Sequence, residues 1–175
     1  MFEGWGEFYL LAGSAAAVLI GLIFVVVTLM QDRPRSSVLA GSKLYMGPIV
    51  LDVSFVLVLS AAALMPEITH SEFALVCAAV ALWGLARGLI STVGISRLKD
   101  EVHWTDVWFY GVIPTVLFAL LGAVAYGFWT EQEWPVRAVA AVSTAILLAA
   151  IRNEWDLVTW LAPQSDESSE PRLDR

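Results

Sequence analysis

Charged and other polar side chains interrupt apolar runs of this sequence, where a charge is costly to place. Asp52 follows the run PIVL, Arg87 follows LWGLA, and Arg152, Asn153, Glu154 and Asp156 interrupt the last run, AAIRNEWDLVTWL. A lone charge at the centre of a bilayer costs about 2.5–3.5 kcal/mol on insertion scales. Ionisable residues inside a membrane therefore pair with one another, line an ion path or relay protons.

The elements that would hold these residues are membrane helices. Of the 175 residues, 58% are hydrophobic and 15% are charged, against roughly 45–50% and about 25% in ordinary soluble domains. The apolar residues form long runs, and about 20 such residues cross the ~30 Å hydrocarbon layer as a helix. The opening MFEGWGEFYL has no basic residue, so we expect a retained span rather than a cleaved signal peptide. The sequence predicts an all-α, polytopic transmembrane helix bundle.

Five spans are predicted in one domain that covers residues 1–162, followed by a disordered acidic cytoplasmic tail at 163–175. The spans cover about 8–30, 44–65, 72–96, 107–129 and 136–162. The sequence THSE at Thr69–Glu72 fits a capping box at the start of the third span. Pro135 suits the first turn of the fifth.

The fifth span has two interpretations. Its uncharged part, 138–151, is about 21 Å long as a helix, which is too short to cross the membrane. Extension to Ala162 makes it long enough and ends it beside Trp160 and Pro163. We favour this continuous helix, and the alternative is four spans plus an interfacial helix at 152–162.

Orientation follows from the basic residues of the short loops. Arg33, Arg35 and Lys43 follow the first span, Arg97 and Lys99 follow the third, and the opposite side holds Arg137. The N-terminus is therefore predicted outside and the C-terminus inside.

This topology predicts a polar layer in the inner half of the bundle, made of Asp52, Arg87, Arg152, Asn153 and Asp156. Asp52, Arg87 and Arg152 lie roughly 12, 13 and 15 Å from the inner ends of their helices. We expect Asp52 to pair with Arg87, Arg152 or both, and Arg152 to share a helix face with Asp156. Such pairs can fix helix register without transport, or they can gate or line an ion path. Both arginines can also extend toward the headgroups.

Small residues and prolines suggest how the helices pack and bend. Small residues at four-residue spacing predict helix-packing faces and favour self-association; they are Gly13, Ala17 and Gly21, then Gly84 and Gly88, then Gly111 and Gly122, then Ala141, Ala145 and Ala149. Gly47 with Pro48, and Pro114, are predicted to break their helices and free backbone carbonyls near the polar layer, including that of Tyr110.

Several function classes lack support in the sequence. No basic patch for nucleic acid and no catalytic or metal-binding motif is present. The two histidines, His70 and His103, fall on opposite sides of the predicted topology, which excludes their joint ligation of a haem. Cys77 is the one cysteine and is expected to pack as a small hydrophobe. We therefore expect no enzyme activity, no metal and no cofactor.

The last helix, with IRNEWDLVTWL, and the first, with GLIFVVVTL, resemble an uncharacterised family of small bacterial multi-pass membrane proteins. The resemblance covers most of the chain and implies a bacterial inner membrane, but no activity.

Two functions remain open. One is a homo-oligomeric ion channel or small-solute pathway with the polar layer on its path. The other is a structural or regulatory membrane protein that binds membrane proteins or anionic lipid at its basic cytoplasmic face, without transport.

Overall fold

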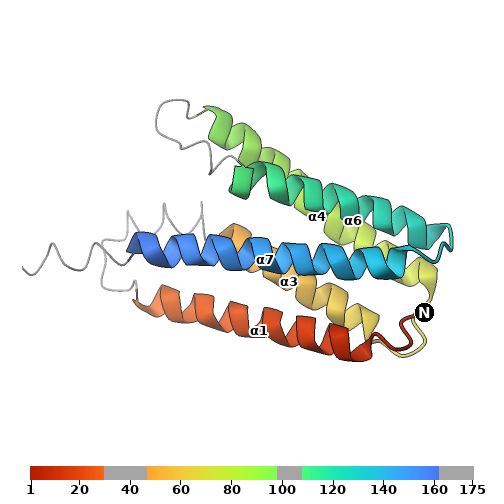
Figure 1. Ribbon diagram of the computed structural model, residues 1–175. Coiled ribbons are helices and arrows are strands. Elements are labelled where there is room, and N and C mark those ends of the chain that lie inside the picture. The colour runs from red at the N-terminus through yellow and green to blue at the C-terminus, as the bar shows by residue number, and fades with distance from the viewer. Residues whose placement is uncertain (30–46, 98–107, 162–175) are drawn as a thin grey trace, which may run out of the picture.

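The computed structural model describes residues 1–29, 47–97 and 108–161, and over these ranges the chain is all-α, as predicted (Figure 1). The helices are α1 (Gly6–Leu29), α3 (Gly47–Ala63), α4 (His70–Arg97), α6 (Ile113–Trp129) and α7 (Pro135–Leu161). A π-helical turn, η2 (Trp108–Val112), leads directly into α6. The predicted tail at 163–175 and most of the basic residues behind the orientation prediction lie outside the described residues.

Two helices begin where the sequence places their start signals. The Thr69 backbone N–H donates to Glu72 Oε2 at 2.9 Å, and the Glu72 N–H donates back to Thr69 Oγ1 at 3.3 Å. This is the reciprocal capping box expected from THSE. Pro135 is the first residue of α7, where its missing N–H leaves no helical hydrogen bond unmade.

Three helices are long and apolar enough to cross a membrane, judged by length and composition. They cover Gly6–Thr28, His70–Ile90 and Pro135–Asp156. The apolar helices α3 and α6 have 17 residues each, which corresponds to about 25 Å at 1.5 Å per residue. The π-helical turn adds length to α6 at its N-terminal end. All five predicted spans therefore correspond to helices, and three of them meet the length of a full span.

The helices form two groups. In one group α4 packs along α6, and in the other α1 packs along α3, with α7 contacting α1, α3 and α6. Figure 1 shows α4 and α6 running at an angle to α7, so that the two groups approach each other most closely near the N-terminus. The starts of α3 and η2 and the ends of α4 and α7 lie toward the opposite end of the molecule, where the two groups diverge (Figure 1).

An aromatic cluster joins the two groups at the end near the N-terminus. It consists of Phe2, Tyr9, Phe73 and Phe128, and all but Phe2 are fully buried. The ring centroids of Phe2 and Phe73 are 4.7 Å apart and those of Phe73 and Phe128 are 5.0 Å apart, both with edge-to-face geometry. Such pairs contribute about 0.5–1.5 kcal/mol beyond the burial of their area. The cluster therefore holds α1, α4 and α6 together at this end.

Close packing of α4 against α6 depends on two glycines that the sequence singled out. A Cβ added at Gly84 would lie 2.2 Å from Phe118 Cγ, and one at Gly88 would lie 2.5 Å from Thr115 Oγ1. Gly122 packs more loosely, since a Cβ there would lie 3.8 Å from the Ala81 Cβ. The helix pair approaches this closely because no side chain separates the backbone of α4 from α6.

The other predicted packing residues differ in how far they are buried within one chain. In α1, Gly13 is buried against Ser60 of α3, but Ala17 and Gly21 are exposed within the chain. In α7, Ala141 is exposed and Ala145 and Ala149 are half-buried. The buried stripe of α7 instead contains Val139, Val142, Ile146, Ala150 and Asn153. Within one chain Ala17, Gly21 and Ala141 are exposed and Gly111 is buried, so a packing role of the first three stays a prediction for contacts between copies.

Candidate functional site

The centre of the candidate site is an ion pair between the two helix groups. Arg87 Nη2 of α4 donates to Asp52 Oδ1 of α3, and the Arg87 and Asp52 side chains are only 18% and 8% exposed. A charge-assisted contact in so buried a place is strong while it is paired and costly when one partner is removed. Of the two partners expected for Asp52, the structure provides Arg87; in the described ranges no ion pair joins Asp52 to Arg152.

The structure describes the backbone on both sides of one of the two predicted proline breaks. The residues before Gly47 lie outside the described ranges, so the break at Gly47 and Pro48 stays a prediction. Pro114 occupies the first turn of α6, directly after η2, and the backbone passes through Val112 with helical dihedrals (φ −69°, ψ −51°). The break expected there is a π-helical turn.

Two side chains donate to backbone carbonyls of this turn. Thr115 Oγ1 donates to the Gly111 carbonyl at 2.7 Å, and Asn153 Nδ2 of α7 donates to the Phe109 carbonyl at 3.4 Å. A π-helical turn shifts the hydrogen-bond register by one residue, so nearby carbonyls need other donors. Asn153, which is 3% exposed, is one of the polar side chains that the sequence placed in this layer.

Arg152 also meets η2, but through its charge and an aromatic face. Its Cζ lies 3.2 Å from the centroid of the Phe109 ring, and its Nη1 lies 2.9 Å from Asp156 Oδ2. The Arg152 and Asp156 side chains are 37% and 40% exposed, so this pair lies at the edge of the bundle. Arg152 therefore makes both a cation–π contact with Phe109 and an i,i+4 ion pair with Asp156.

The turn η2 contacts both α4 and α7, which carry residues of the predicted polar layer. Asp52 and Arg87 join α3 to α4, while Asn153 and Arg152 join α7 to η2. α7 runs as one helix from Pro135 to Leu161 through its charged residues. It therefore follows the continuous-helix interpretation, and not that of a short helix followed by a separate one.

One buried acid was missing from the predicted layer. Glu154 of α7 is 8% exposed, nearly as buried as Asp52 at 6%. It follows Asn153 directly in the sequence. The sequence contained a signal for it, because Ser143, Leu147, Ala150 and Glu154 recur at the four- and three-residue spacing of one helix face.

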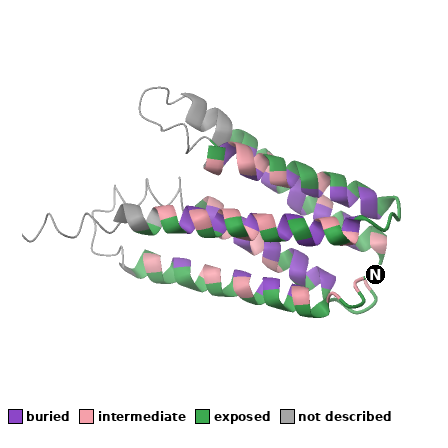
Figure 2. Cartoon of the chain, in the orientation of Figure 1, coloured by how far each residue is buried: buried purple, intermediate pink, exposed green. Residues whose placement is uncertain are grey.

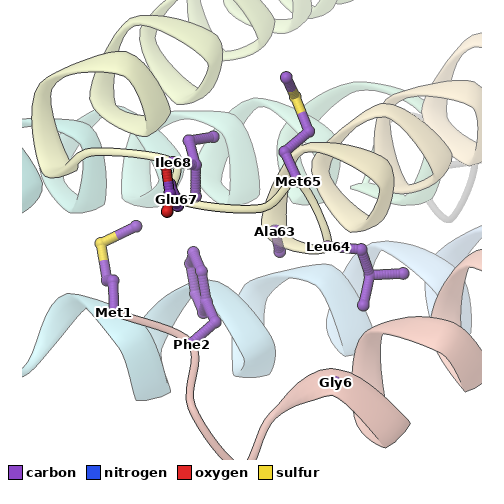
Figure 3. Close-up of a pocket in the computed structure, with 8 residues that line it drawn as sticks. All are labelled: Met1, Phe2, Gly6, Ala63, Leu64, Met65, Glu67 and Ile68. Atoms are coloured by element: carbon purple, nitrogen blue, oxygen red, sulfur yellow. The ribbon is translucent and has the colours of Figure 1, made fainter.

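A separate cleft lies at the opposite end of the molecule. It has a volume of about 290 Å³ and lies between the N-terminal segment and the loop after α3; its lining residues are Met1, Phe2, Gly6, Ala63, Leu64, Met65, Glu67 and Ile68. Figure 3 shows Met1 and Phe2 on one side of the cleft and Glu67 and Ile68 on the other. Its lining side chains are apolar apart from that of Glu67. Its volume is close to the lower limit of small-molecule sites, about 300 Å³.

No known protein family, curated protein or solved structure matches this chain. The class of this protein is therefore inferred from its own sequence and structure. It is an all-α chain with three helices long and apolar enough to cross a membrane, and it carries buried charge at one end. Among the described residues, no group of three or more histidine, cysteine or acidic side chains is arranged to hold a metal ion.

Proposed function

We propose that this chain is an integral membrane protein of the bacterial inner membrane that forms a homo-oligomeric ion channel or small-solute pathway. In this proposal the five helices are spans, the N-terminus lies outside and the C-terminus lies inside. The polar layer, with Asp52 and Arg87 at its centre, gates the inner half of the path. No cofactor and no enzymatic step are involved.

The distribution of side chains supports the membrane part of the proposal. Large apolar side chains face outward on several helices, with Leu11 70%, Leu82 69% and Ile90 73% exposed. Figure 2 shows exposed residues along the whole length of α1. Asp52, Asn153 and Glu154 are buried instead. Exposed apolar surface of this extent, together with buried charge, is typical of helices that face lipid.

The observation that carries the gating part is the Asp52–Arg87 ion pair between the two helix groups. The aromatic cluster joins the groups at one end and the ion pair joins them at the other. Movement of α4 and α6 away from α3 at the polar end would have to separate these two charges. Water or an ion that enters this end would stabilise the separated charges, because hydration replaces the lost pairing. The ion pair would therefore hold the polar end closed while it is formed, and it would have to break for that end to open.

In this proposal, association of several copies encloses the path, which a single copy cannot enclose. Five helices packed around buried apolar residues leave their own centre filled by side chains such as Val53, Val56, Leu121 and Ile146. A path along the surface of one copy becomes enclosed only when neighbouring copies cover it. The exposed small residues Ala17 and Gly21 of α1 permit close approach of another helix.

A second function is supported by the same ion pair. Asp52 and Arg87 are paired and largely buried, and buried pairs can fix helix register and partner choice without any transport. The chain would then act as a structural or regulatory protein, with membrane-protein or anionic-lipid partners at its cytoplasmic face.

Flux through purified protein in proteoliposomes tests the two functions against each other. We expect Na⁺, K⁺, H⁺ or Cl⁻ flux with the wild type, and a several-fold change in rate or selectivity with Arg87→Gln. The matched control is Arg137→Gln, since Arg137 is exposed and lies near the start of α7, away from the polar layer. Absence of flux for all four ions, with folded and inserted protein, would contradict the channel and favour the structural function.

A further inference from the structure

The cleft near the N-terminus has no role in the proposed pathway. It has a volume of about 290 Å³ and lies between the segment before α1 and the loop after α3. The structure describes this end of the molecule without a gap, since the segment before α1 and the loops 64–69 and 130–134 are all included. The chemistry of the cleft therefore follows from described side chains.

The walls of the cleft are mostly apolar and include a packed aromatic ring. Met1 and Phe2 lie on one side, and Met65 and Ile68 come from the loop after α3 (Figure 3). The Phe2 ring makes an edge-to-face contact with Phe73, with 4.7 Å between the ring centroids. Methionine side chains adapt to ligands of different shape. These walls suit a ligand with a compact apolar part.

Glu67 is the one acidic residue of this lining. Figure 3 shows its side chain across the cleft from Met1 and Phe2. Glu67 is exposed, and within the described ranges no ion pair involves its carboxylate. A ligand that places a positive charge beside Glu67 would therefore gain an electrostatic contact while its apolar part lies against Phe2.

The surrounding end of the molecule carries an excess of negative charge. Its described basic groups are Arg137 at the start of α7, His70 and the amino group of Met1. Against these it has the glutamates of the segment before α1, of the first turns of α1 and α4 and of the two loops, namely Glu3, Glu7, Glu67, Glu72, Glu131 and Glu133. A field of this sign raises the local concentration of cations. Charge complementarity therefore favours a cationic ligand.

An organic ammonium ion fits this lining better than a metal ion does. Ca²⁺ takes six to eight oxygen ligands, and the described residues contain no group of three or more histidine, cysteine or acidic side chains that could hold a metal ion. A quaternary ammonium ion needs no hydrogen-bond acceptor and is bound by aromatic rings and nearby negative charge. Phe2 and Glu67 offer both.

We propose that this cleft binds a small organic cation of the quaternary ammonium class, with its charge beside Glu67 and its apolar part against Phe2, Met1 and Met65. A lipid chain or an apolar segment of another protein would use the walls alone and would gain nothing from the carboxylate. The cleft lies at the opposite end of the molecule from the polar layer, so the proposal does not depend on the channel.

Methionine methyl NMR on the full-length protein in a nonionic detergent tests the site. The chain has four methionines, Met1, Met30, Met46 and Met65, and single Met→Leu variants assign their isotope-labelled methyl signals. Titration with benzyltrimethylammonium should shift the signals of Met1 and Met65, which line the cleft, and leave the other two in place. Neopentylbenzene, the neutral isostere, should bind about five-fold more weakly or worse.

Glu67→Gln should weaken binding of the cation about five-fold, whereas Glu131→Gln should leave the affinity unchanged. Glu131 is the matched control because it is exposed, lies at the same end outside the lining, and has a similar φ of 53° against 57° for Glu67. Equal affinity for the cation and its isostere, or an unchanged affinity in Glu67→Gln, would overturn the proposal and leave an apolar site for a lipid chain. Absence of shifts, or equal shifts of all four signals from partition into the micelle, would overturn it as well.

Discussion

Arg87 and Asp52 lie 35 positions apart in the sequence, yet their side chains form a buried ion pair that connects α4 to α3. The pair is the polar counterpart of the aromatic cluster at the other end. Each connects the two helix groups, one through charge and the other through packed rings. Removal of one partner of the pair should therefore lower the free energy of unfolding much more than removal of both.

Neutralisation of one partner should destabilise the protein more than neutralisation of both. Asp52→Asn or Arg87→Gln leaves an unpaired buried charge, and we expect a loss of about 3–5 kcal/mol in the free energy of unfolding. The double variant should recover a large part of that loss. Unfolding in mild detergent, followed by circular dichroism, measures all three. Additive losses in the double variant would show that the two charges do not interact.

The packing of α4 on α6 predicts a strong position dependence among glycines. Gly84→Ala places a methyl group 2.2 Å from Phe118 Cγ, so Phe118 or the whole helix must move. We expect a loss of about 1–3 kcal/mol in unfolding free energy, as for other overpacked cores.

Gly21→Ala is the matched control for this variant. A Cβ at Gly21 meets nothing within 4 Å in the chain, and alanine gains up to about 1 kcal/mol over glycine in a helix interior. Gly21→Ala should therefore be neutral or stabilising in a monomeric detergent preparation. Equal destabilisation by both substitutions would contradict the close approach of α4 and α6.

The turn after α6 predicts a stabilising substitution. Glu131 has a φ of 53°, in the left-handed region, while its N–H donates to the Phe128 carbonyl and the Gln132 N–H donates to the Gly127 carbonyl. These bonds form a Schellman motif, whose left-handed position favours glycine. Glu131→Gly should raise the free energy of unfolding by about 1 kcal/mol. Glu133→Gly, outside the left-handed region, should give no gain, and a similar rise in both would refute this explanation.

The contact of Arg152 with Phe109 predicts a smaller effect at the edge of the polar layer. Phe109→Leu keeps an apolar side chain but removes the ring below the guanidinium. We expect a loss of about 0.5–2 kcal/mol, the range of cation–π contacts between exposed and desolvated sites. Trp108→Leu changes an exposed neighbour in the same turn and should have less effect. A double change with Arg152→Gln should show coupling, and its absence would refute the contact.

Much of the fold could be predicted because membrane-length apolar runs and their capping signals are local. The helix starts near Thr69 and at Pro135 follow from short-range chemistry. The contact of Asp52 with Arg87 could be anticipated as one of two options, because charges of opposite sign at the same depth have few other partners.

The packing faces were harder to predict because almost every residue of these helices is apolar. Neighbouring residues lie about 100° apart around a helix, so Ala141, Ala145 and Ala149 lie beside the buried face that Val142, Ile146 and Ala150 occupy. Most outward-facing residues of α7 are apolar as well, so the sequence does not distinguish its outward face from its buried face. The burial of Glu154 was missed for a related reason, since its sequence neighbours Arg152 and Asp156 suggested one common polar face.

The π-helical turn before Pro114 depends on contacts distant in sequence. Its displaced carbonyl at Phe109 is satisfied by Asn153, 44 residues away. A proline predicts that a helix is disturbed, but the form of the disturbance depends on which donor the neighbouring helix supplies.

Ion flux in proteoliposomes, with Asp52→Asn compared with the wild type at matched incorporation, tests the central claim most directly. Asp52→Asn removes the ion pair that is proposed to close the path. We therefore predict flux in the wild type and a several-fold higher or less selective flux in Asp52→Asn. Wild-type protein that is folded and inserted but carries no ion, together with an equally silent Asp52→Asn variant, would contradict the claim that the polar layer gates a pathway.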